Sequence, residues 1–224
     1  LSSRTSREAA PIRDLLGAGG DQEIPDSGFA ASGMTKWVVR ASKTLMSERF
    51  VLITGCSGGG KSSLLAELAA RGHAVIEEPG RRIVREELAS GGQALPWVEG
   101  GETFLRRAIA LSLADRQAAE AYEGWVFFDR GLIDAASGLQ SVTSEPVLRP
   151  LATQHRYHRR VFIAPPWPEI YETDPERRHG FEAGLVEQRR LEGELPTLGY
   201  EVIELPKTTV AARADFVLGV LAHA

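Results

Sequence analysis

Short apolar runs alternate along the chain with longer segments in which apolar residues recur every three or four positions. The short runs predict buried strands, and the longer segments predict amphipathic helices. This alternation is typical of βα units in an α/β fold with a mostly parallel sheet. Helices are expected at about 61–71, 80–90, 102–123, 145–157, 180–198 and 209–222. The five expected strands are Phe50 to Thr54, Ala74 to Glu77, Trp125 to Phe128, Arg160 to Ala164 and Tyr200 to Leu205.

The first 45 residues show neither the short apolar runs of buried strands nor the apolar spacing of amphipathic helices. They are rich in Ser, Gly, Ala and charged residues, a composition that buries little apolar surface and favours disorder. Met46 stands four residues before the first strong strand. We therefore expect residues 1–45 to be a disordered leader or dispensable tail, and residues 46–224 to form one folded domain.

Composition narrows the class of protein. Hydrophobic residues make up 43% and charged residues 25% of the chain, the balance of a soluble globular protein. The net charge of -4, without a long basic run, disfavours nucleic acid as a partner. The single cysteine, Cys56, excludes an internal disulfide and suits a reducing compartment. Without an apolar stretch of about 18 residues or a signal peptide, the expected location is the cytoplasm, away from membranes.

A phosphate-binding motif joins the first strand to the first helix. The segment from Gly55 to Ser62 matches G-x-x-x-x-G-K-[ST], and an apolar run precedes it as the motif requires. Its glycines let backbone N–H groups point inward, where the helix N-terminus and Lys61 add positive charge. An ordinary turn would match by chance in roughly one chain of this length in a hundred. The expected nucleotide contacts are Gly55, Cys56, Ser57, Gly58, Gly59, Gly60, Lys61, Ser62 and Ser63.

One hydroxyl and one carboxylate are candidates for holding Mg²⁺. Ser62 supplies a hydroxyl directly after the motif lysine. Asp129 ends the apolar run Trp125 to Phe128, in the form of a Walker B segment whose acid holds Mg²⁺ directly or through water. Arg130 follows it. A strand-terminal Asp can also be only a helix cap, so this assignment depends on the upstream phosphate loop.

Charged residues after the second strand are candidates for binding an acceptor. Glu78, Arg81 and Arg82 are expected at the carboxyl edge of the sheet, where open α/β sheets bind ligands. Glu78 could take a proton from a substrate hydroxyl, and either arginine could hold an anionic acceptor bidentately. The alternative is a solvated, charged helix start.

Further arginines are candidates for a lid. Arg177 and Arg178 follow the proline-rich exit of the fourth strand, from which they could close over the phosphates. Arg106 and Arg107 are weaker candidates, and ordinary surface charge is the alternative for both pairs.

Several of these segments together resemble a known family. Phe50 to Ser63, Glu78 to Arg82, Phe128 to Gly131 and Ala164 to Tyr171 are similar to a bacterial family of P-loop ATPases of the AAA type. That family is related to the kinase domain of nicotinamide riboside kinases, and the same segments resemble thymidylate and deoxynucleoside kinases. The resemblance implies that Glu78 binds or deprotonates the acceptor and that Asp129 and Arg130 touch metal and phosphate. It also implies a lid role for Arg177 and an adenine site in the loop that contains Lys207.

The residues and the resemblance together predict a kinase-like three-layer P-loop fold with a five-stranded sheet. The expected activity is transfer of the γ-phosphate of ATP, with Mg²⁺, to a small nucleoside- or nucleotide-like acceptor. The alternative is a regulatory ATPase that switches contacts with a protein partner. A guanine-recognising Asn-Lys-x-Asp is absent from the sequence, which favours ATP. A nucleotide-binding module without turnover is a third option, which the presence of Lys61, Ser62 and Asp129 disfavours.

Overall fold

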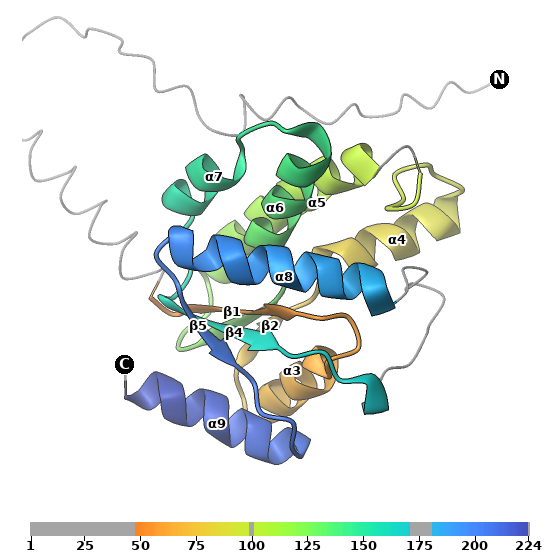
Figure 1. The fold of residues 1–224 in the computed structure, drawn as a ribbon. Helices are drawn as coiled ribbons and strands as arrows, with labels where there is room; N and C mark the ends of the chain where they lie inside the picture. The colour runs from red at the N-terminus through yellow and green to blue at the C-terminus, as the bar shows by residue number, and fades with distance from the viewer. Residues whose placement is uncertain (1–47, 99–100, 171–180, 224) are drawn as a thin grey trace, which may run out of the picture.

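A computed structural model describes residues 48–98, 101–170 and 181–223. The expectations for residues 1–45 and for Arg177 and Arg178 therefore lie outside the described residues. Strands and helices alternate along most of the described chain (Figure 1). The elements are β1 (Phe50–Gly55), α3 (Lys61–Ala70), β2 (Ala74–Ile76), α4 (Pro79–Ser90), α5 (Glu102–Ala119), β3 (Val126–Asp129), α6 (Leu132–Thr143), α7 (Leu148–Gln154), β4 (Arg160–Ala164), η2 (Pro168–Ile170), α8 (Phe181–Thr197), β5 (Glu201–Glu204) and α9 (Val210–Ala222).

The sheet has the five predicted strands, each within two residues of its expected limits. Their order is β2-β3-β1-β4-β5, and every neighbouring pair is parallel. Parallel sheets are buried on both faces, so their central strands are apolar throughout. All six residues of β1 are buried accordingly. The mostly parallel sheet expected from the sequence is confirmed.

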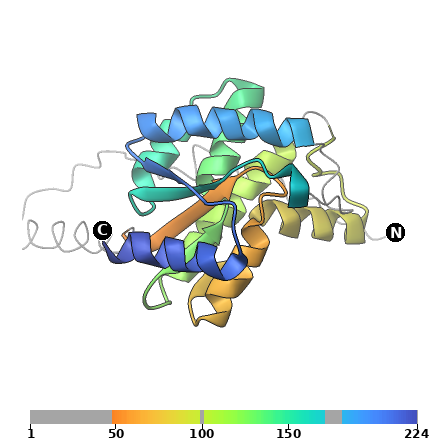
Figure 2. The same ribbon diagram turned by 60° about the horizontal axis from the view of Figure 1, so that its bottom comes forward.

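Helices cover both faces of the sheet, which gives three layers. Helices α4 to α8 lie on one face, and α3 and α9 lie on the other (Figures 1 and 2). Side chains alternate across the sheet: Phe50 and Leu52 of β1 pack into the cluster on the α4–α8 side. Val51 and Ile53 pack against α3 and α9. The three-layer kinase-like fold predicted from the sequence is therefore confirmed.

One helix of the structure was not predicted from the sequence. Helix α6 spans Leu132–Thr143, where no helix was expected, and the helix expected at about 145–157 is the shorter α7. The first eight residues of α6 are all buried, so the segment lacks the apolar-polar contrast that reveals a surface helix. Gly138 lies against Leu105 of α5, where a Cβ would come within 2.8 Å of Leu105 Cδ2. Close packing between α5 and α6 thus requires a residue that weakens the helical signal.

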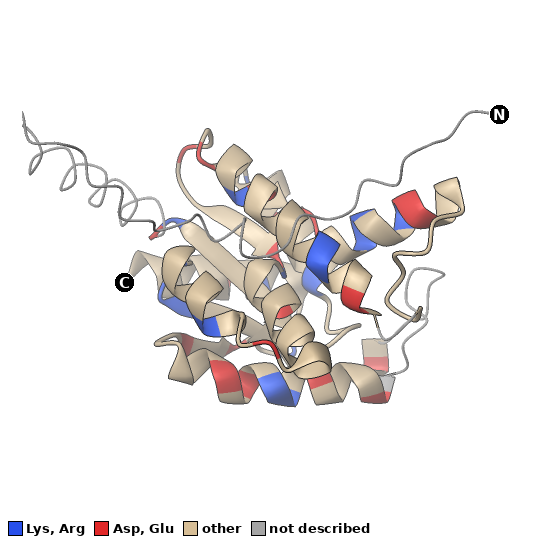
Figure 3. Ribbon diagram, turned by 90° about the horizontal axis from the view of Figure 1, so that it is seen from above, with Lys and Arg blue, Asp and Glu red and all other residues tan. Residues whose placement is uncertain are grey.

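Charged residues of both signs lie on α4, α5 and α8, on one side of the sheet (Figure 3). Some form ion pairs between neighbouring helices, such as Arg82 of α4 with Asp115 of α5 at 2.8 Å. Arg107 of α5 pairs with Glu86 of α4 at 2.5 Å. Within the described ranges, none of the helices is long and apolar enough to cross a membrane.

Candidate functional site

The phosphate loop curls directly after the central strand β1. Gly55, Gly58 and Gly60 have φ angles of 105°, 80° and 72°, in the left-handed region that favours glycine. Gly60 caps the N-terminus of α3, whose first helical residue is Lys61. The loop also lies against the end of β4, because the Cys56 N–H donates to the Ala164 carbonyl at 3.1 Å. The positive end of the α3 dipole therefore lies at the loop, where it would stabilise a bound phosphate.

Gly55 cannot be replaced without disturbing the loop. A Cβ at this position would lie 2.5 Å from the Ala164 carbonyl oxygen, in addition to the strain of its φ angle. We expect Gly55→Ala to lower the free energy of unfolding by about 3 kcal/mol or more, as urea denaturation would measure. Gly72→Ala is the matched control, since Gly72 has a φ of 90° and open space around it. It should cost about 1–2 kcal/mol, and equal losses in the two variants would contradict the proposed crowding.

Lys61 is buried under the phosphate loop. Its side chain is 6% exposed, and its Nζ donates to the carbonyls of Gly55 at 3.1 Å and Cys56 at 2.8 Å. Burial, with a further contribution from the nearby Arg130 guanidinium, lowers the pKa of Lys61 to about 8. Burial has removed water from around this ammonium group, which disfavours its charged form. A bound polyphosphate would stabilise the positive charge.

Asp129 ends β3 beside the loop and has an unused acceptor atom. The residue is 5% exposed, and its Oδ1 is buried without a hydrogen-bond partner among the described residues. Burial raises the pKa of Asp129 to about 6, and the negative charge of Glu78 adds to the effect. A cation near this carboxylate would reverse that shift. The orphaned oxygen and the exposed Ser62 hydroxyl at the start of α3 together fit Mg²⁺ bound largely by phosphate and water.

The raised pKa of Asp129 has a consequence for stability. The folded protein favours the protonated form of Asp129, because the pKa of this group is higher in the folded than in the unfolded chain. The contribution of Asp129 to the free energy of unfolding is therefore most favourable below about pH 4 and is lost as the pH rises through about 6. We therefore expect Asp129→Asn to raise the free energy of unfolding at pH 7.5 by about 1–3 kcal/mol without nucleotide. Urea denaturation between pH 4 and 8 would measure this. A variant less stable than the wild type at pH 7.5 would contradict the assignment.

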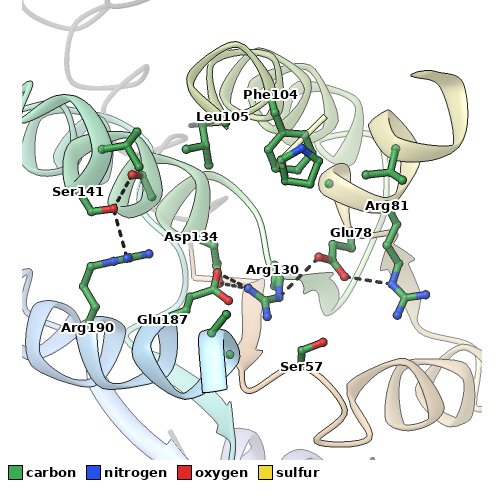
Figure 4. Close-up of a pocket in the computed structure, with 18 residues that line it drawn as sticks. Ser57, Glu78, Arg81, Phe104, Leu105, Arg130, Asp134, Ser141, Glu187 and Arg190 are labelled. Atoms are coloured by element: carbon green, nitrogen blue, oxygen red, sulfur yellow. Dashed lines mark hydrogen bonds and ion pairs between the residues drawn. The ribbon is translucent and has the colours of Figure 1, made fainter. Parts of the chain in front are cut away.

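Arg130 joins the phosphate loop to three carboxylates. It adopts a φ of 55°, and its Nη2 donates to the Gly55 carbonyl at 3.0 Å. Its Nη1 pairs with Glu187 of α8 at 2.5 Å and lies 3.9 Å from Asp134 of α6, while its Nε lies 3.6 Å from Glu78. Burial favours the neutral form of Glu187, but Arg130 outweighs it and lowers the pKa of Glu187 below its ordinary value. The guanidinium is thus fixed at the centre of the site (Figure 4).

Asp134 and Glu187 were not predicted from the sequence. Asp134 accepts a hydrogen bond from the Thr54 hydroxyl at the end of β1, and burial raises its pKa to about 6. Asp134 lies on the helix that the sequence analysis missed. Arg130 precedes α6 and has a φ of 55°, so the spacing of the two residues along the chain did not indicate their contact. Nothing in the sequence places Glu187, since the packing of α8 decides its position.

Two cavities meet beside this arginine. The first, of about 520 Å³, opens over the phosphate loop, and the second, of about 470 Å³, lies between α4, α5, α6 and α8. Ser57, Glu78 and Arg130 line both. The remaining lining of the first is Gly58, Gly60, Lys61, Ser62, Ser63, Trp167, Ile170, Thr208, Thr209, Val210 and Arg213. The remaining lining of the second is Gly80, Arg81, Val84, Pro96, Gly101, Phe104, Leu105, Asp134, Gly138, Ser141, Val142, Ala183, Gly184, Glu187 and Arg190.

Some of the candidate arginines lie away from these cavities. Arg106 pairs with Glu102 of its own helix α5 and with Glu145 in the segment between α6 and α7. Arg107 pairs with carboxylates of α4 and so connects α5 to α4. Arg82 is likewise paired with Asp115. Arg81 does line the second cavity, and its Nε donates to Glu78 Oε2 at 3.3 Å.

The loop between β5 and α9 borders the first cavity, but Lys207 is not part of its lining. Lys207 is exposed, and Thr208, Thr209 and Val210 contact the cavity instead. The loop therefore lies where an adenine ring was expected, and a direct contact by Lys207 remains a prediction.

Arg213 is a residue of this site that the sequence analysis did not identify. It is 1% exposed and donates to the carbonyls of Gly59 at 3.0 Å and Gly60 at 3.2 Å. Its guanidinium carbon lies 5.7 Å from the centroid of the Trp167 ring. Within the described part of the chain, no carboxylate pairs with it, and burial lowers its pKa. It thus places an uncompensated positive charge beside the phosphate loop.

The fold and the loop agree with comparisons to known proteins. The family model of an AAA domain matches residues 50–213. Shikimate kinase from Acinetobacter baumannii in complex with shikimate has a similar structure, with a TM-score of 0.50 at 16% identity. The match covers 81% of this chain and 97% of that chain. No curated protein matches the chain in sequence.

Two structures of NadR are also similar. NadR in complex with NR has a TM-score of 0.59 at 15% identity, and NadR in complex with NAD and AMP-PNP has a TM-score of 0.55 at 16% identity. Each match covers 88% of this chain and 60% of NadR, so the chain spans only part of the length of NadR. At these identities the similarity establishes a shared fold.

Proposed function

Because the chain belongs to the AAA domain family, we propose that it binds ATP with Mg²⁺ and transfers the γ-phosphate to a small-molecule acceptor. The observation that carries this proposal is the meeting of two cavities at Glu78 and Arg130. A site that only hydrolyses ATP needs a nucleotide cavity and a water molecule. A second cavity of about 470 Å³, within the range of small-molecule sites, instead suits an organic acceptor.

The first cavity has the features of a donor site. Its loop N–H groups and the ammonium of Lys61 would hold the β- and γ-phosphates. Ser62 and Asp129 would hold Mg²⁺, which neutralises the charge of the phosphates when bound. Arg213 would add a buried positive charge on the side of the loop that faces α9. The nucleoside would extend toward Trp167 and the loop after β5, which line the same cavity.

The second cavity has the features of an acceptor site. Glu78 lies where the two cavities join, so an acceptor hydroxyl next to it would face the γ-phosphate. In the transfer step the hydroxyl oxygen bonds to the γ-phosphorus as the bond to the bridging oxygen of ADP breaks. The hydroxyl proton passes to the Glu78 carboxylate. Arg130, fixed by Glu187 and the Gly55 carbonyl, would stabilise the charge on the transferring group.

The fold of similar proteins supports this assignment of the two cavities. NadR has been solved with NR and with NAD and AMP-PNP, and shikimate kinase with shikimate. The same fold therefore accommodates both a nucleotide analogue and small organic molecules. The walls of the second cavity come from side chains of α4, α5, α6 and α8 of this chain, which determine the acceptor that it can bind.

ATP consumption with Mg²⁺ against nucleosides, nucleotides, ribosides and sugars tests the proposal. Lys61→Ala provides the blank. The expected result is that at least one acceptor raises ADP formation in a Lys61-dependent manner and yields a phosphorylated product. If ATP binds but none of the acceptors raises turnover, the alternative of a regulatory ATPase with a protein partner gains support.

A further inference from the structure

The end of the second cavity farthest from the phosphate loop contains an arginine with unusual partners. Figure 4 shows Arg190 and Ser141 at one end of the cavity, Glu78 and Arg81 at the other, and Arg130 between them. Arg190 projects from α8, and its Nε donates to the Ser137 hydroxyl of α6 at 2.8 Å. Its Nη1 donates to the Ser141 hydroxyl at 3.2 Å. Its position is thus set by two neutral groups one helical turn apart.

The other two arginines of this cavity are already paired with carboxylates. Arg130 pairs with Glu187 at 2.5 Å, and Arg81 with Glu78 at 3.3 Å. The carboxylates near Arg190 are engaged elsewhere as well. Glu187 turns to Arg130, and Glu194 accepts the Ser137 hydroxyl at 2.5 Å. Among the described residues, Arg190 is therefore the cation of this cavity without a carboxylate partner.

The guanidinium of Arg190 retains capacity to bind an anion. It has five N–H donors, and the serine hydroxyls occupy one on Nε and one on Nη1. The donors that remain are one on Nη1 and two on Nη2, and one N–H from each of these nitrogens can bind the two oxygens of a carboxylate or phosphate. Because the serines fix the side chain before a ligand arrives, little side-chain entropy is lost on binding.

One wall between the two ends is apolar, opposite the charged group around Arg130. Phe104 and Leu105 of α5 lie above Arg130 in Figure 4, and Val84 and Val142 also line the cavity. Such a surface suits the face of a ring or a hydrocarbon body. An acceptor that spans the cavity would place one polar group at Glu78 and another at Arg190.

We propose that the acceptor carries an oxyanion, either a carboxylate or a phosphate monoester, that binds Arg190, with an apolar ring body against Phe104 and Leu105. This inference rests on the proposed function, since it assigns the second cavity to the acceptor. The reacting hydroxyl lies at the opposite end of the molecule, beside Glu78. Neutral nucleosides and sugars are then poor acceptors, and hydroxylated ring acids or nucleoside monophosphates are good ones.

Paired probes that differ only in the anion test this inference. Binding to the full chain is measured calorimetrically for 4-hydroxybenzoate and its methyl ester, and for thymidine monophosphate and thymidine. These measurements need no turnover, so they succeed or fail independently of phosphate transfer. Arg190→Gln removes the charge, and Arg189→Gln is the matched control on the exposed side of α8. Turnover of ATP with each probe is then measured separately.

The expected result is that at least one anion binds better than its neutral partner and that Arg190→Gln weakens this binding about tenfold to a hundredfold. Arg189→Gln should bind as the wild type does. Preference for the acid or for the monophosphate identifies the kind of oxyanion. Three results would overturn the inference. These are equal affinity for the anion and its neutral partner, an affinity that Arg190→Gln does not change, and no binding of any probe at millimolar concentration. Anion binding through Arg190 without transfer from ATP would instead count against the proposed function alone.

Discussion

Replacing Lys61 by methionine is expected to lower ATP turnover by at least about a hundredfold, the cost of removing one charged donor from a developing phosphate charge. The ammonium group lies under the loop within 3.1 Å of the carbonyls of Gly55 and Cys56. Arg130 also contacts the Gly55 carbonyl, but its charge is paired with a carboxylate of α8. The same variant should unfold at an equal or higher temperature than the wild type without nucleotide. Burial lowers the pKa of Lys61 to about 8, which means that the charged side chain opposes folding below that pH.

These opposite effects on stability and activity distinguish a functional lysine from a structural one. Thermal unfolding with and without ATP and Mg²⁺, followed by a turnover assay, measures both. The wild type should gain stability when the nucleotide is added, and the variant should gain much less. A variant that is strongly destabilised without nucleotide would show that Lys61 mainly holds the loop together, contrary to the proposed role.

The second large effect is expected for Glu78→Gln. If Glu78 takes the proton of the substrate hydroxyl as proposed, its loss should lower kcat by about 10² to 10⁴ and leave the KM for ATP nearly unchanged. The reason is position: Glu78 lines both cavities, and its carboxylate lies between the guanidiniums of Arg81 and Arg130. The measurement is steady-state kinetics with the acceptor that the substrate panel identifies.

Glu77→Gln is the matched control for this prediction. Glu77 precedes Glu78 in the chain but pairs with Arg85 at the surface, where both side chains are about half exposed. Its removal should change kcat by less than a factor of about 2, because surface ion pairs contribute little. Unchanged turnover in Glu78→Gln would remove Glu78 from the mechanism and direct attention to Asp134 and Glu187, the other two carboxylates near Arg130.

The sequence predicted the part of the site that belongs to strand ends. Lys61 and Glu78 come shortly after β1 and β2, and Asp129 is the last residue of β3. These three strands are neighbours in the sheet and parallel. Their carboxyl ends therefore meet at one edge. Apolar runs locate such strands, and the phosphate motif identifies the central one, so a sequence alone brings these residues together.

The residues contributed by helices could not be predicted in the same way. Glu187 and Arg190 lie on α8, about fifty residues or more along the chain from the partners they contact. Only the packing of α8 in the folded protein brings them together. Asp134 was not predicted because helix α6 was not predicted, and the uniform burial of the start of α6 hides the helical period in the sequence. Arg213 did leave a signal, since it stands next to Ala214 and Val217 on the buried side of α9. A charged residue on an apolar stripe indicates a buried, functional or paired cation.

The fate of the γ-phosphate tests the central claim most directly. ATP labelled in the γ-phosphate is incubated with the protein, Mg²⁺ and a mixture of small metabolites, and the labelled products are separated. The account predicts that label appears in an organic phosphate, and that Lys61→Met and Glu78→Gln both prevent its appearance. Label recovered only as inorganic phosphate, at a rate that small molecules do not change, would contradict it.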